Sequence, residues 1–513
     1  MVQVSIFDFI DNPLKAYEIT KPIRLIELFA GIGSQAKALE RLGADFEHYR
    51  VIEFDKYAVA SYNAIHHTDF EPMDVTKIKG SDLGIVDCDK YTYLLTYSYP
   101  CQDLSVAGKQ RGMSKGGGTR SGLLWEVERI LNECDKLPEV LLMENVPQVH
   151  GVKFINDFEK WCKFLESKGY TNFWQDMNAK DYGVAQSRNR TFMISILQQN
   201  VIYEFPEPIP LDKKICDYLD EKVDKKFYVE NEKTQKLIAD LVNSDTILDR
   251  QTDRQTDKTM SGFRCRRSER HSLSNGWNTA LPECNTVQRC NEDIGIKKIG
   301  RCGMGKYYME QVIVASRGRS PQNPSDRTKG IPLEQRLEIR EGGITNTITS
   351  VQKDNLVMEK ETVLIKQATK SGMIECEVGG VADLSFPDSA TRRGRVIDKG
   401  NTSPTLQTDG EICRIEKDEQ VRTKYRIRKL TAKECYRLMD FDDNDFFAAE
   451  SVNSDTQLYK QAGNSIVVSC LCAIFSQLGI KGITPWNEMS MEQKRELSKV
   501  NKVDNTSYER NPL

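Results

Sequence analysis

The sequence predicts an α/β protein with a doubly wound, Rossmann-like domain, interrupted by an inserted region of mostly β or irregular structure. Between residues 22 and 196, short apolar runs alternate with helical patterns, as in βαβ units that build a mostly parallel sheet. After residue 200 this alternation stops, and a polar region rich in Gly, Thr and Arg extends to residue 424. Amphipathic helical patterns return at residues 428–439 and 457–478.

These changes divide the 513-residue chain into four parts. We expect residues 1–200 to form the first part of a catalytic and cofactor-binding domain, and residues 201–424 to form the insert. Residues 425–482 would return to the first domain, and residues 483–513 would be a polar, frayed helical tail. The low-complexity stretch at residues 248–258 predicts a solvated loop inside the insert.

Composition restricts the class of protein further. With 39% hydrophobic and 29% charged residues, the chain is neither disordered nor a membrane bundle. The formal net charge of −3 means that any binding of nucleic acid depends on local basic patches. The N-terminus lacks a cationic export signal, and the longest apolar stretch, residues 466–475, is too short to span a bilayer. We expect a cytoplasmic protein without a membrane anchor.

The cysteines and histidines predict no metal site. The 14 cysteines include no CxxC pair, and the five histidines do not complete a zinc-binding spacing with them. We therefore expect reduced thiols and no bound metal.

The first chemical feature is a glycine turn. Residues 23–29 form an apolar run, and the turn Phe29-Ala30-Gly31-Ile32-Gly33 separates it from a helical pattern at residues 35–42. Glycines at such a turn let a ligand approach the backbone and present amides at a helix N-terminus. Taken alone, the turn fits a tight packing corner equally well.

Two acidic residues favour the ligand-binding interpretation. Glu53 ends a second apolar run about 20 residues after the glycine turn, where a carboxylate in a Rossmann-like sheet binds ribose hydroxyls. Asp74 falls where we expect a third strand to end, and could bind an adenine amino group. The turn and the two acids together predict a nucleoside cofactor.

The second feature is a cysteine after the run at residues 93–96. Pro100-Cys101-Gln102 follows this run, and flexible sequence with Lys109 and Arg111 comes next. At the carboxyl end of a central strand the Cys101 thiolate could be exposed and stabilised, although a single cysteine is more often buried and inert.

Polar residues also end the next two apolar runs. Glu144 follows the run at residues 140–143, which predicts that it lies on the same sheet edge as Cys101. Arg188 and Arg190 precede the run at residues 191–196, and their spacing places them on one side of an extended chain, suited to binding carbonyl or phosphate oxygens.

Together these motifs resemble the DNA cytosine-5 methyltransferase family of bacteria and phages. The resemblance covers residues 22–200 and 425–480. Its motifs occur in the family's order: Phe29-Ala30-Gly31-Ile32-Gly33, Pro100-Cys101-Gln102, Glu144-Asn145-Val146, Gln186-Ser187-Arg188-Asn189-Arg190, Arg428-Lys429-Leu430-Thr431 and Gln461-Ala462-Gly463-Asn464-Ser465.

The resemblance implies an S-adenosylmethionine-dependent methyltransferase that adds a methyl group to carbon 5 of cytosine. Cys101 would add to carbon 6, Glu144 would bind ring nitrogen 3, Arg190 would contact the base oxygen, and Arg188 would support Glu144. The residues that it assigns to the cofactor are Phe29, Gly31, Gly33, Glu53, Phe54, Asp74, Pro100 and Asn464.

The implied partner is double-stranded DNA, from which the target base must be flipped into the site. A loop at residues 105–122 would close over the base, with Ser105, Lys109 and Arg111 facing the DNA. The insert would be the target-recognition domain. Its repeated Thr-aliphatic pattern gives three candidates for the family's recognition threonine: Thr286, Thr347 and Thr405.

The threonines are 61 and 58 residues apart, and arginine clusters precede each one. This arrangement fits either tandem recognition modules or one large domain that repeats a turn pattern. Thr405 is nearest the C-terminal motifs, but the sequence does not choose among the three.

Two other functions stay open: an RNA cytosine-5 methyltransferase, and a non-catalytic DNA-binding regulator on the same scaffold. The long Arg-rich insert argues against the first, and the intact Cys101, Glu144, Arg188 and Arg190 argue against the second. We expect a monomer, and leave open a separate cognate restriction endonuclease as partner and the sequence that is methylated.

Overall fold

The structure is a computed structural model of the whole chain. The residues that it describes are 14–104, 111–220, 223–229, 231–243, 247–248, 296–299, 306–309, 311–323, 331–339, 343–349, 355–360, 362–366, 373–377, 381–383, 412–414 and 425–503.

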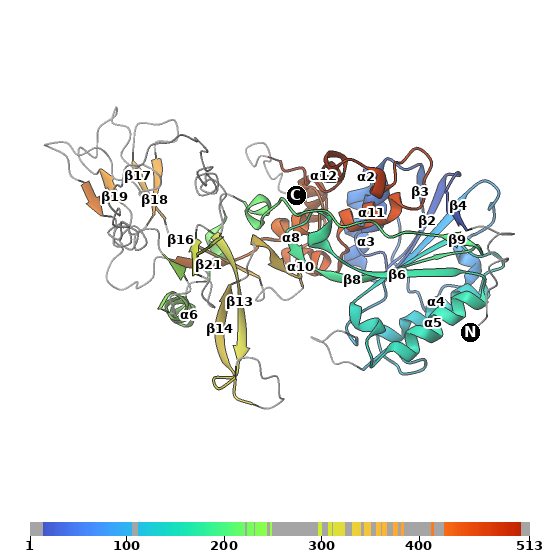
Figure 1. The fold of residues 1–513 in the computed structure, drawn as a ribbon, viewed down its shortest axis with the longest axis horizontal. Helices are drawn as coiled ribbons and strands as arrows, with labels where there is room; N and C mark the ends of the chain where they lie inside the picture. Colours follow the sequence, from blue (N-terminus) through green and yellow to red (C-terminus); the bar gives the residue numbers. More distant parts are fainter. Residues whose placement is uncertain are drawn as a thin grey trace, which may run out of the picture. The chain divides into compact units, whose positions relative to one another are not determined.

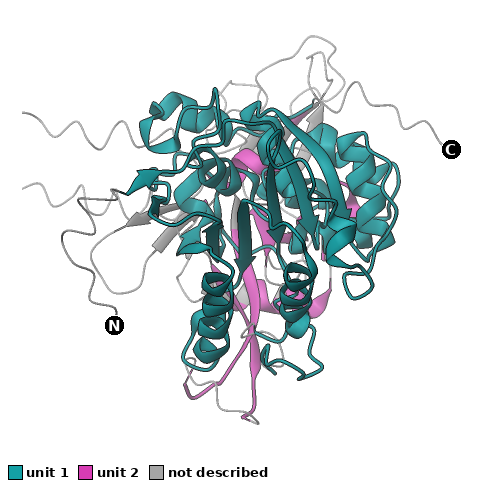
Figure 2. Ribbon diagram, turned by 90° about the vertical axis from the view of Figure 1, so that its right-hand side faces the viewer, with its two compact units in different colours: residues 1–213, 344–351, 431–513 teal, residues 214–343, 352–430 magenta. Residues whose placement is uncertain are grey.

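The chain forms two compact units (Figure 2). The first comprises residues 1–213, 344–351 and 431–513, and the second comprises residues 214–343 and 352–430. The short segment 344–351 belongs to the first unit, although it lies inside the region where we expect target recognition. The first unit is therefore built from three separate stretches of sequence.

A six-stranded sheet organises the first unit, in the order β3-β2-β4-β5-β8-β6. β3, β2, β4 and β5 are parallel, and β8 is antiparallel to both β5 and β6. The strands of this sheet are β2 (Ile23–Leu28), β3 (Phe46–Ile52), β4 (Thr92–Tyr97), β5 (Val140–Asn145), β6 (Thr171–Asn178) and β8 (Asn189–Ile196). The unit also contains four two-residue strands among its described residues, which pair outside this sheet: β1 (Lys15–Ala16), β7 (Gln186–Ser187), β9 (Val201–Ile202) and β15 (Thr345–Asn346).

Helices cover both faces of this sheet. Every residue of β4 and β5 is buried, as expected for central strands covered on both sides. In Figure 1, α2, α3 and α11 lie on one side of the sheet and α4 and α5 on the other. The helices of the unit are α2 (Ser34–Leu42), α3 (Lys56–His66), α4 (Leu124–Glu133), α5 (Ile155–Ser167), α8 (Ala432–Leu438), α9 (Asp443–Glu450), α10 (Asp455–Asn464), α11 (Val468–Ser476) and α12 (Met491–Leu497). This architecture confirms the predicted doubly wound, Rossmann-like α/β fold.

Three sequence-based expectations about elements are corrected. No strand ends at Asp74, because the third strand of the sheet, β4, begins only at Thr92. The helical pattern at 457–478 is two helices, α10 and α11, separated at residues 465–467. Arg428 does not begin a helix but lies in a strand, β21 (Tyr425–Lys429), and the helix α8 follows it.

The expected polar tail is also partly wrong. Trp486 is fully buried and its indole Nε1 donates to the Glu207 carbonyl at 2.8 Å. α12 begins with a capping box, in which Ser490 and Gln493 satisfy each other's backbone amides. Residues 483–503 are thus part of the first unit, where the buried Trp486 anchors an otherwise charged and polar segment.

The second unit is rich in short strands. An antiparallel sheet in the order β14-β13-β16-β21 packs on α6, and its core comprises Ile238, Val314, Leu337, Leu356, Met358 and Ile427. Its elements are α6 (Glu232–Asn243), β10 (Ile247–Leu248), β11 (Ile296–Ile299), β12 (Lys306–Met309), β13 (Gln311–Arg319), β14 (Glu334–Ile339), β16 (Leu356–Lys360), β17 (Thr362–Lys366), β18 (Met373–Glu377), β19 (Val381–Asp383), β20 (Ile412–Arg414) and β21. The described part of the insert is therefore mostly β and irregular, as the sequence predicts.

Among the described residues, one helical run has the length and apolar composition of a membrane span. It covers Asp455–Ser476, and 83% of its most apolar window is buried inside the protein. A buried core helix meets the same criteria, so this run is weak evidence for a membrane span.

Candidate active site

The glycine turn joins β2 to α2 in a left-handed backbone conformation. Phe29, Gly31 and Gly33 have φ angles of 59°, 59° and 80°. Such a φ is uncommon for an aromatic residue, and residues held in this region cluster at functional sites. The Phe29 amide donates to the Ile52 carbonyl at 2.8 Å, which fixes the turn against the end of β3.

The two glycines of the turn have different surroundings. A Cβ added at Gly31 would meet no heavy atom within 4 Å, whereas a Cβ added at Gly33 would lie 2.3 Å from His66 Nε2. Gly31 therefore borders open space that a ligand could fill. From the sequence we expect both glycines to let a ligand approach. Gly33 is instead required because His66 packs against it.

Glu53 supports the turn directly. Its Oε2 accepts a hydrogen bond from the Gly31 amide at 3.0 Å, and its Oε1 accepts one from the Asp55 amide at 2.8 Å. Burial raises the pKa of Glu53, and these amide hydrogen bonds oppose that shift. Each carboxylate oxygen keeps a second lone pair, so Glu53 can hold the turn and still accept from a ribose hydroxyl.

Phe54, the next residue, is 76% exposed at the end of β3. An exposed aromatic ring beside the glycine turn gives a flat apolar surface on which a purine could pack.

Asp74 reaches the same edge of the sheet without a strand of its own. The Met73 amide donates to the Glu53 carbonyl at 2.8 Å, which holds this loop beside the end of β3. Asp74 Oδ1 accepts from the amide and hydroxyl of Thr76, and these hydrogen bonds lower its pKa.

The C-terminal stretch brings Asn464 to the glycine turn. Asn464 is the last residue of α10 and is exposed. Two residues further on, the Ile466 amide donates to the Ser34 hydroxyl at 3.2 Å, at the start of α2. Residues more than 400 positions apart in sequence therefore meet at the N-terminus of α2.

Cys101 lies in a turn just beyond the end of β4. Asn145 Nδ2, at the end of β5, donates to the Tyr99 carbonyl at 3.0 Å, and the Ser121 hydroxyl donates to the Pro100 carbonyl at 2.6 Å. Burial raises the pKa of the Cys101 thiol; the charge of Glu144 adds to this shift, while the arginines 188 and 190 oppose it. The thiol is thus half-buried among charged groups, not an exposed and stabilised thiolate as expected.

Glu144 and Arg190 form an ion pair, in which Arg190 Nε lies 3.0 Å from Glu144 Oε1. Both side chains are largely buried, with exposed fractions of 10% and 15%. β8 places Arg190 there because it runs antiparallel to β5, with Phe192 opposite Glu144. Arg190, and not Arg188 as predicted, therefore contacts Glu144.

Arg188 binds backbone carbonyls instead. Its guanidinium donates to the Ser465 carbonyl at 2.6 Å, to the Ile348 carbonyl at 3.0 Å and to the Gly463 carbonyl at 3.3 Å. It is buried, and it joins three parts of the first unit: the segment before β8, the insert segment 344–351, and the end of α10.

The same insert segment contains Thr347. β15 pairs in parallel with β7, the Thr347 hydroxyl donates to the Ser187 carbonyl at 2.9 Å, and the Ile348 amide donates to Gln186 Oε1 at 2.9 Å. Thr347 is thus attached to the Gln186-Ser187-Arg188 motif beside the candidate site. Thr286 and Thr405 lie outside the described residues.

The expected DNA-facing loop is described only in part. Ser105 and Lys109 lie outside the described residues, while Arg111 is exposed. The loop returns at Gly112, whose amide donates to the Asp103 carbonyl at 3.0 Å, and the Arg120 amide donates to Asp103 Oδ2 at 2.9 Å.

Sequence reasoning gave no role to several residues that fix this geometry: Tyr99, Asp103, Ser121, Asn145 and Gln186. Asn145 and Gln186 stand within quoted motifs, so their position beside Glu144 and Arg188 was a usable signal. Asp103 and Ser121 gave no such signal in the sequence, because the residues to which they hydrogen-bond lie 17 and 21 positions away.

A doubly wound sheet with a glycine turn after its first strand, and with a cysteine and a glutamate ending neighbouring central strands, defines a methyltransferase of the cytosine C5 class. The profile of the C-5 cytosine-specific DNA methylase family matches residues 23–479. The chain belongs to this family of enzymes, whose members generally use S-adenosylmethionine.

Named relatives agree with this assignment. The chain is 36% identical over 256 residues to the type II methyltransferase M2.ScrFI of Lactococcus lactis subsp. cremoris, covering 41% of this chain and 71% of the relative. It is 37% identical over 266 residues to the orphan methyltransferase M.SssI of Spiroplasma monobiae, covering 41% and 68%. The orphan methyltransferase M.SPRI of Bacillus phage SPR is 27% identical over 505 residues, covering 89% of this chain and 97% of the phage protein.

Among solved structures, the Entamoeba histolytica methyltransferase EhMeth covers 90% of this chain and 98% of its own length, with 14% identity and a TM-score of 0.46.

Proposed function

We propose that this enzyme methylates carbon 5 of a cytosine that is flipped out of a specific double-stranded DNA sequence, through a covalent adduct with Cys101. The observation that best supports this proposal is the grouping of Cys101 and Glu144 at the carboxyl ends of the parallel strands β4 and β5, with Arg190 beside them at the start of the antiparallel strand β8. Ligands bind at this edge of open α/β sheets.

The need for a nucleophile follows from the chemistry of cytosine. Carbon 5 belongs to an aromatic ring and is a poor nucleophile. Addition of the Cys101 thiolate to carbon 6 forms a carbon–sulfur bond and moves electron density to carbon 5. After carbon 5 has gained the methyl group, loss of its proton and departure of the Cys101 thiolate restore the aromatic ring.

Glu144 would assist this addition by donating a proton or a hydrogen bond to ring nitrogen 3, which takes up the displaced charge. Arg190 keeps Glu144 oriented through its Nε, and its other N–H groups would donate to the oxygen on carbon 2 of the base. Arg188 acts as a positioning residue, because it holds carbonyls and not the substrate.

The cofactor pocket would be formed by Phe29, Gly31, Gly33, Glu53, Phe54, Asp74, Pro100 and Asn464. The open space beside Gly31 and the exposed Phe54 ring fit a nucleoside with a short amino-acid tail. S-adenosylmethionine, when bound, supplies the electrophilic methyl group. Glu53 would bind the ribose hydroxyls and Asp74 the adenine amino group.

We further propose residues 1–200 and 425–482 as the catalytic domain and residues 201–424 as the target-recognition region. Recognition of DNA requires contacts to base edges and to phosphates, and the Thr286, Thr347 and Thr405 regions with their arginines are the candidates. The proposed enzyme works as a monomer in the cytoplasm, with or without a separate restriction endonuclease.

Trapping with a modified base tests the covalent route. We expect the enzyme, with S-adenosylmethionine and duplex DNA of random sequence that contains 5-fluorocytosine, to form a complex that survives denaturation, because fluorine cannot leave as a proton does. Cys101→Ser should form none. Cys162→Ser, which removes another half-buried thiol on α5, should trap as well as the unmodified enzyme. Absence of a stable complex with active enzyme would contradict the covalent route.

A direct comparison separates the DNA and RNA alternatives. Methyl transfer from labelled S-adenosylmethionine should go to genomic DNA and not to total tRNA, measured side by side at equal cytosine content. Preferential labelling of tRNA would overturn the proposed substrate while leaving the Cys101 chemistry intact.

A further inference from the structure

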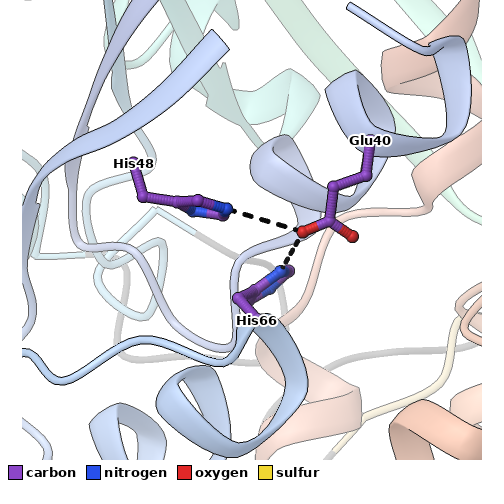
Figure 3. A group of neighbouring side chains, drawn as sticks. All are labelled: Glu40, His48 and His66. Atoms are coloured by element: carbon purple, nitrogen blue, oxygen red, sulfur yellow. Dashed lines mark hydrogen bonds and ion pairs between the residues drawn. The ribbon is translucent and has the colours of Figure 1, made fainter.

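Three side chains behind the glycine turn gather around one point. Glu40 lies on α2, His48 on β3, and His66 is the last residue of α3. One ligand atom from each lies within 4.8 Å of the other two. Figure 3 shows a single carboxylate oxygen of Glu40 facing both imidazole rings, 2.6 Å from His66 Nδ1 and 3.6 Å from His48 Nε2.

The position of one proton on His66 is fixed by its other nitrogen. His66 Nε2 lies 3.1 Å from the Ile32 carbonyl oxygen, which can only accept a hydrogen bond. Nε2 therefore has the proton, and in the neutral ring the lone pair is on Nδ1. In the neutral ring that lone pair would face the Glu40 oxygen at 2.6 Å, so either a proton or a metal ion must lie between these two atoms.

His48 is fixed in the same way. Its Nδ1 lies 2.9 Å from the Tyr62 hydroxyl, and this hydroxyl donates its only proton to Glu27 at 2.5 Å. The Tyr62 oxygen must then accept from His48 Nδ1, which leaves the lone pair of the neutral ring on Nε2. That atom faces the same oxygen of Glu40.

Three electron-pair donors thus converge with no proton between them when the rings are neutral. This arrangement is repulsive unless a proton or a metal ion lies between the donors; a proton accounts for the 2.6 Å hydrogen bond between His66 and Glu40. An added proton can bridge Glu40 to one ring only, whereas a metal ion can satisfy all three donors. Histidine ligands of metals almost always donate their second N–H to a carbonyl or another acceptor, as both rings do here.

We propose that Glu40, His48 and His66 form a binding site for a divalent transition-metal ion, with Zn²⁺ as the expected occupant. Two imidazoles and one carboxylate form a known zinc ligand set, and the fourth position would be taken by water. Tetrahedral Zn²⁺ with donors at about 2.0–2.1 Å requires them to be about 3.3 Å apart, so binding would lengthen the 2.6 Å separation and shorten the 3.6 Å one.

The site also has a route of entry. The side chains of Glu40 and His48 are 31% and 19% exposed, while that of His66 is fully buried. Lys37 Nζ lies 3.7 Å from the other oxygen of Glu40, so the carboxylate is held on its far side as well.

The proposed ion would be structural. It would link α2, β3 and α3 directly behind the glycine turn, because His66 Nε2 also holds the Ile32 carbonyl within that turn. We expect the bound metal to stabilise the first unit, as any ligand that binds only the folded state does. This inference concerns the protein's stability and does not depend on the proposed methyl-transfer mechanism.

Metal titration of the full chain tests the site. After removal of metals with a chelator and removal of the chelator, calorimetry should show one Zn²⁺ bound per chain. Glu40→Gln and His48→Gln should each weaken this binding at least tenfold and abolish the rise in melting temperature that Zn²⁺ causes. His67→Asn is the matched control, because it removes an exposed neighbouring imidazole, and asparagine tolerates the left-handed backbone there.

Co²⁺ distinguishes this site from binding by the many thiols. The Co²⁺ spectrum should show ligand-field bands without thiolate charge transfer, and the bands should be lost in Glu40→Gln and His48→Gln but kept in His67→Asn. Circular dichroism of the metal-free variants checks that they fold. The proposal is overturned if the folded wild type binds no stoichiometric Zn²⁺, if the variants bind it as tightly, or if the spectrum shows thiolate ligands.

Discussion

Burial, and after it the charge of Glu144, opposes ionisation of the Cys101 thiol. Burial and Glu144 raise the pKa of the thiol, so less thiolate is present at neutral pH than for a free cysteine. We expect Glu144→Gln to lower the pH at which Cys101 reacts with iodoacetamide, because the variant removes the neighbouring negative charge.

Mass spectrometry resolves this reaction cysteine by cysteine. Cys162 is the internal control, since burial and the nearby Glu166 and Glu159 raise its pKa to about 11, and Glu144 plays no part. The pH dependence of Cys162 alkylation should therefore be the same in Glu144→Gln and in the wild type. An unchanged profile for Cys101 would show that Glu144 does not set the state of the thiol in the free enzyme.

Glu27 makes the stability of the protein depend on pH. This side chain is fully buried on β2, and burial raises its pKa from 4.5 to about 7, against the opposing hydrogen bond from Tyr62. The folded state therefore holds the proton more tightly than the unfolded chain. The stability that comes from the protonated carboxyl is full below about pH 4.5 and is lost as the pH rises through about 7.

Glu27→Gln should remove this dependence. Glutamine keeps the acceptor for Tyr62 and never ionises, so the variant should be more stable than the wild type at pH 8, by up to about 3 kcal/mol, and similar to it at pH 5. Urea unfolding at both pH values measures the difference. Glu159→Gln, an exposed change on α5, should show no such pH dependence. A wild-type advantage at pH 8 would contradict the assignment.

At the scale of elements, the two glycines of the β2–α2 turn have different roles. Gly33 allows His66 to pack, and Gly31 borders the space proposed for the cofactor. Gly31→Ala places a methyl group in open space, so its folding cost is the left-handed backbone alone, about 1–2 kcal/mol. Gly33→Ala pays the same cost and also pushes against His66, which adds about 1–3 kcal/mol.

We expect Gly31→Ala to fold and to bind S-adenosylmethionine more weakly, and Gly33→Ala to lose more stability. Thermal unfolding and calorimetry, done on both variants, measure the two effects separately. Full cofactor affinity in a folded Gly31→Ala protein would place the pocket elsewhere.

At the scale of the whole molecule, Thr347 differs from the other two threonines of the insert. It lies in the first unit, on the Gln186-Ser187-Arg188 motif, so Thr347→Ala should reduce methylation at every target sequence. If the insert contains separate modules, Thr286→Ala and Thr405→Ala should each remove one methylated sequence and leave others.

Bisulfite sequencing of DNA from cells that express each variant reads out this difference. Loss of a single sequence in Thr347→Ala, with others kept, would make Thr347 a module of its own. A single methylated sequence in the wild type would exclude multiple specificities.

The sequence by itself determined the fold class and the set of residues at the sheet edge. Local patterns suffice for this, because an apolar run, a glycine turn and a polar residue after a strand occupy neighbouring positions. In a parallel sheet, the carboxyl ends of the strands share one edge, so Cys101 and Glu144 could be placed together without knowing any contact.

Only the tertiary structure decided which partners these residues have. Arg190 pairs with Glu144 because β8 is antiparallel to β5, a direction that the sequence pattern does not reveal. Arg188 binds the carbonyls of Ile348, Gly463 and Ser465, which lie 160 to 277 residues away. The cluster of Glu40, His48 and His66 is likewise assembled from two helices and a strand, whose packing brings unrelated positions within 4.8 Å. Contacts of this kind depend on how whole elements pack, and no local pattern encodes them.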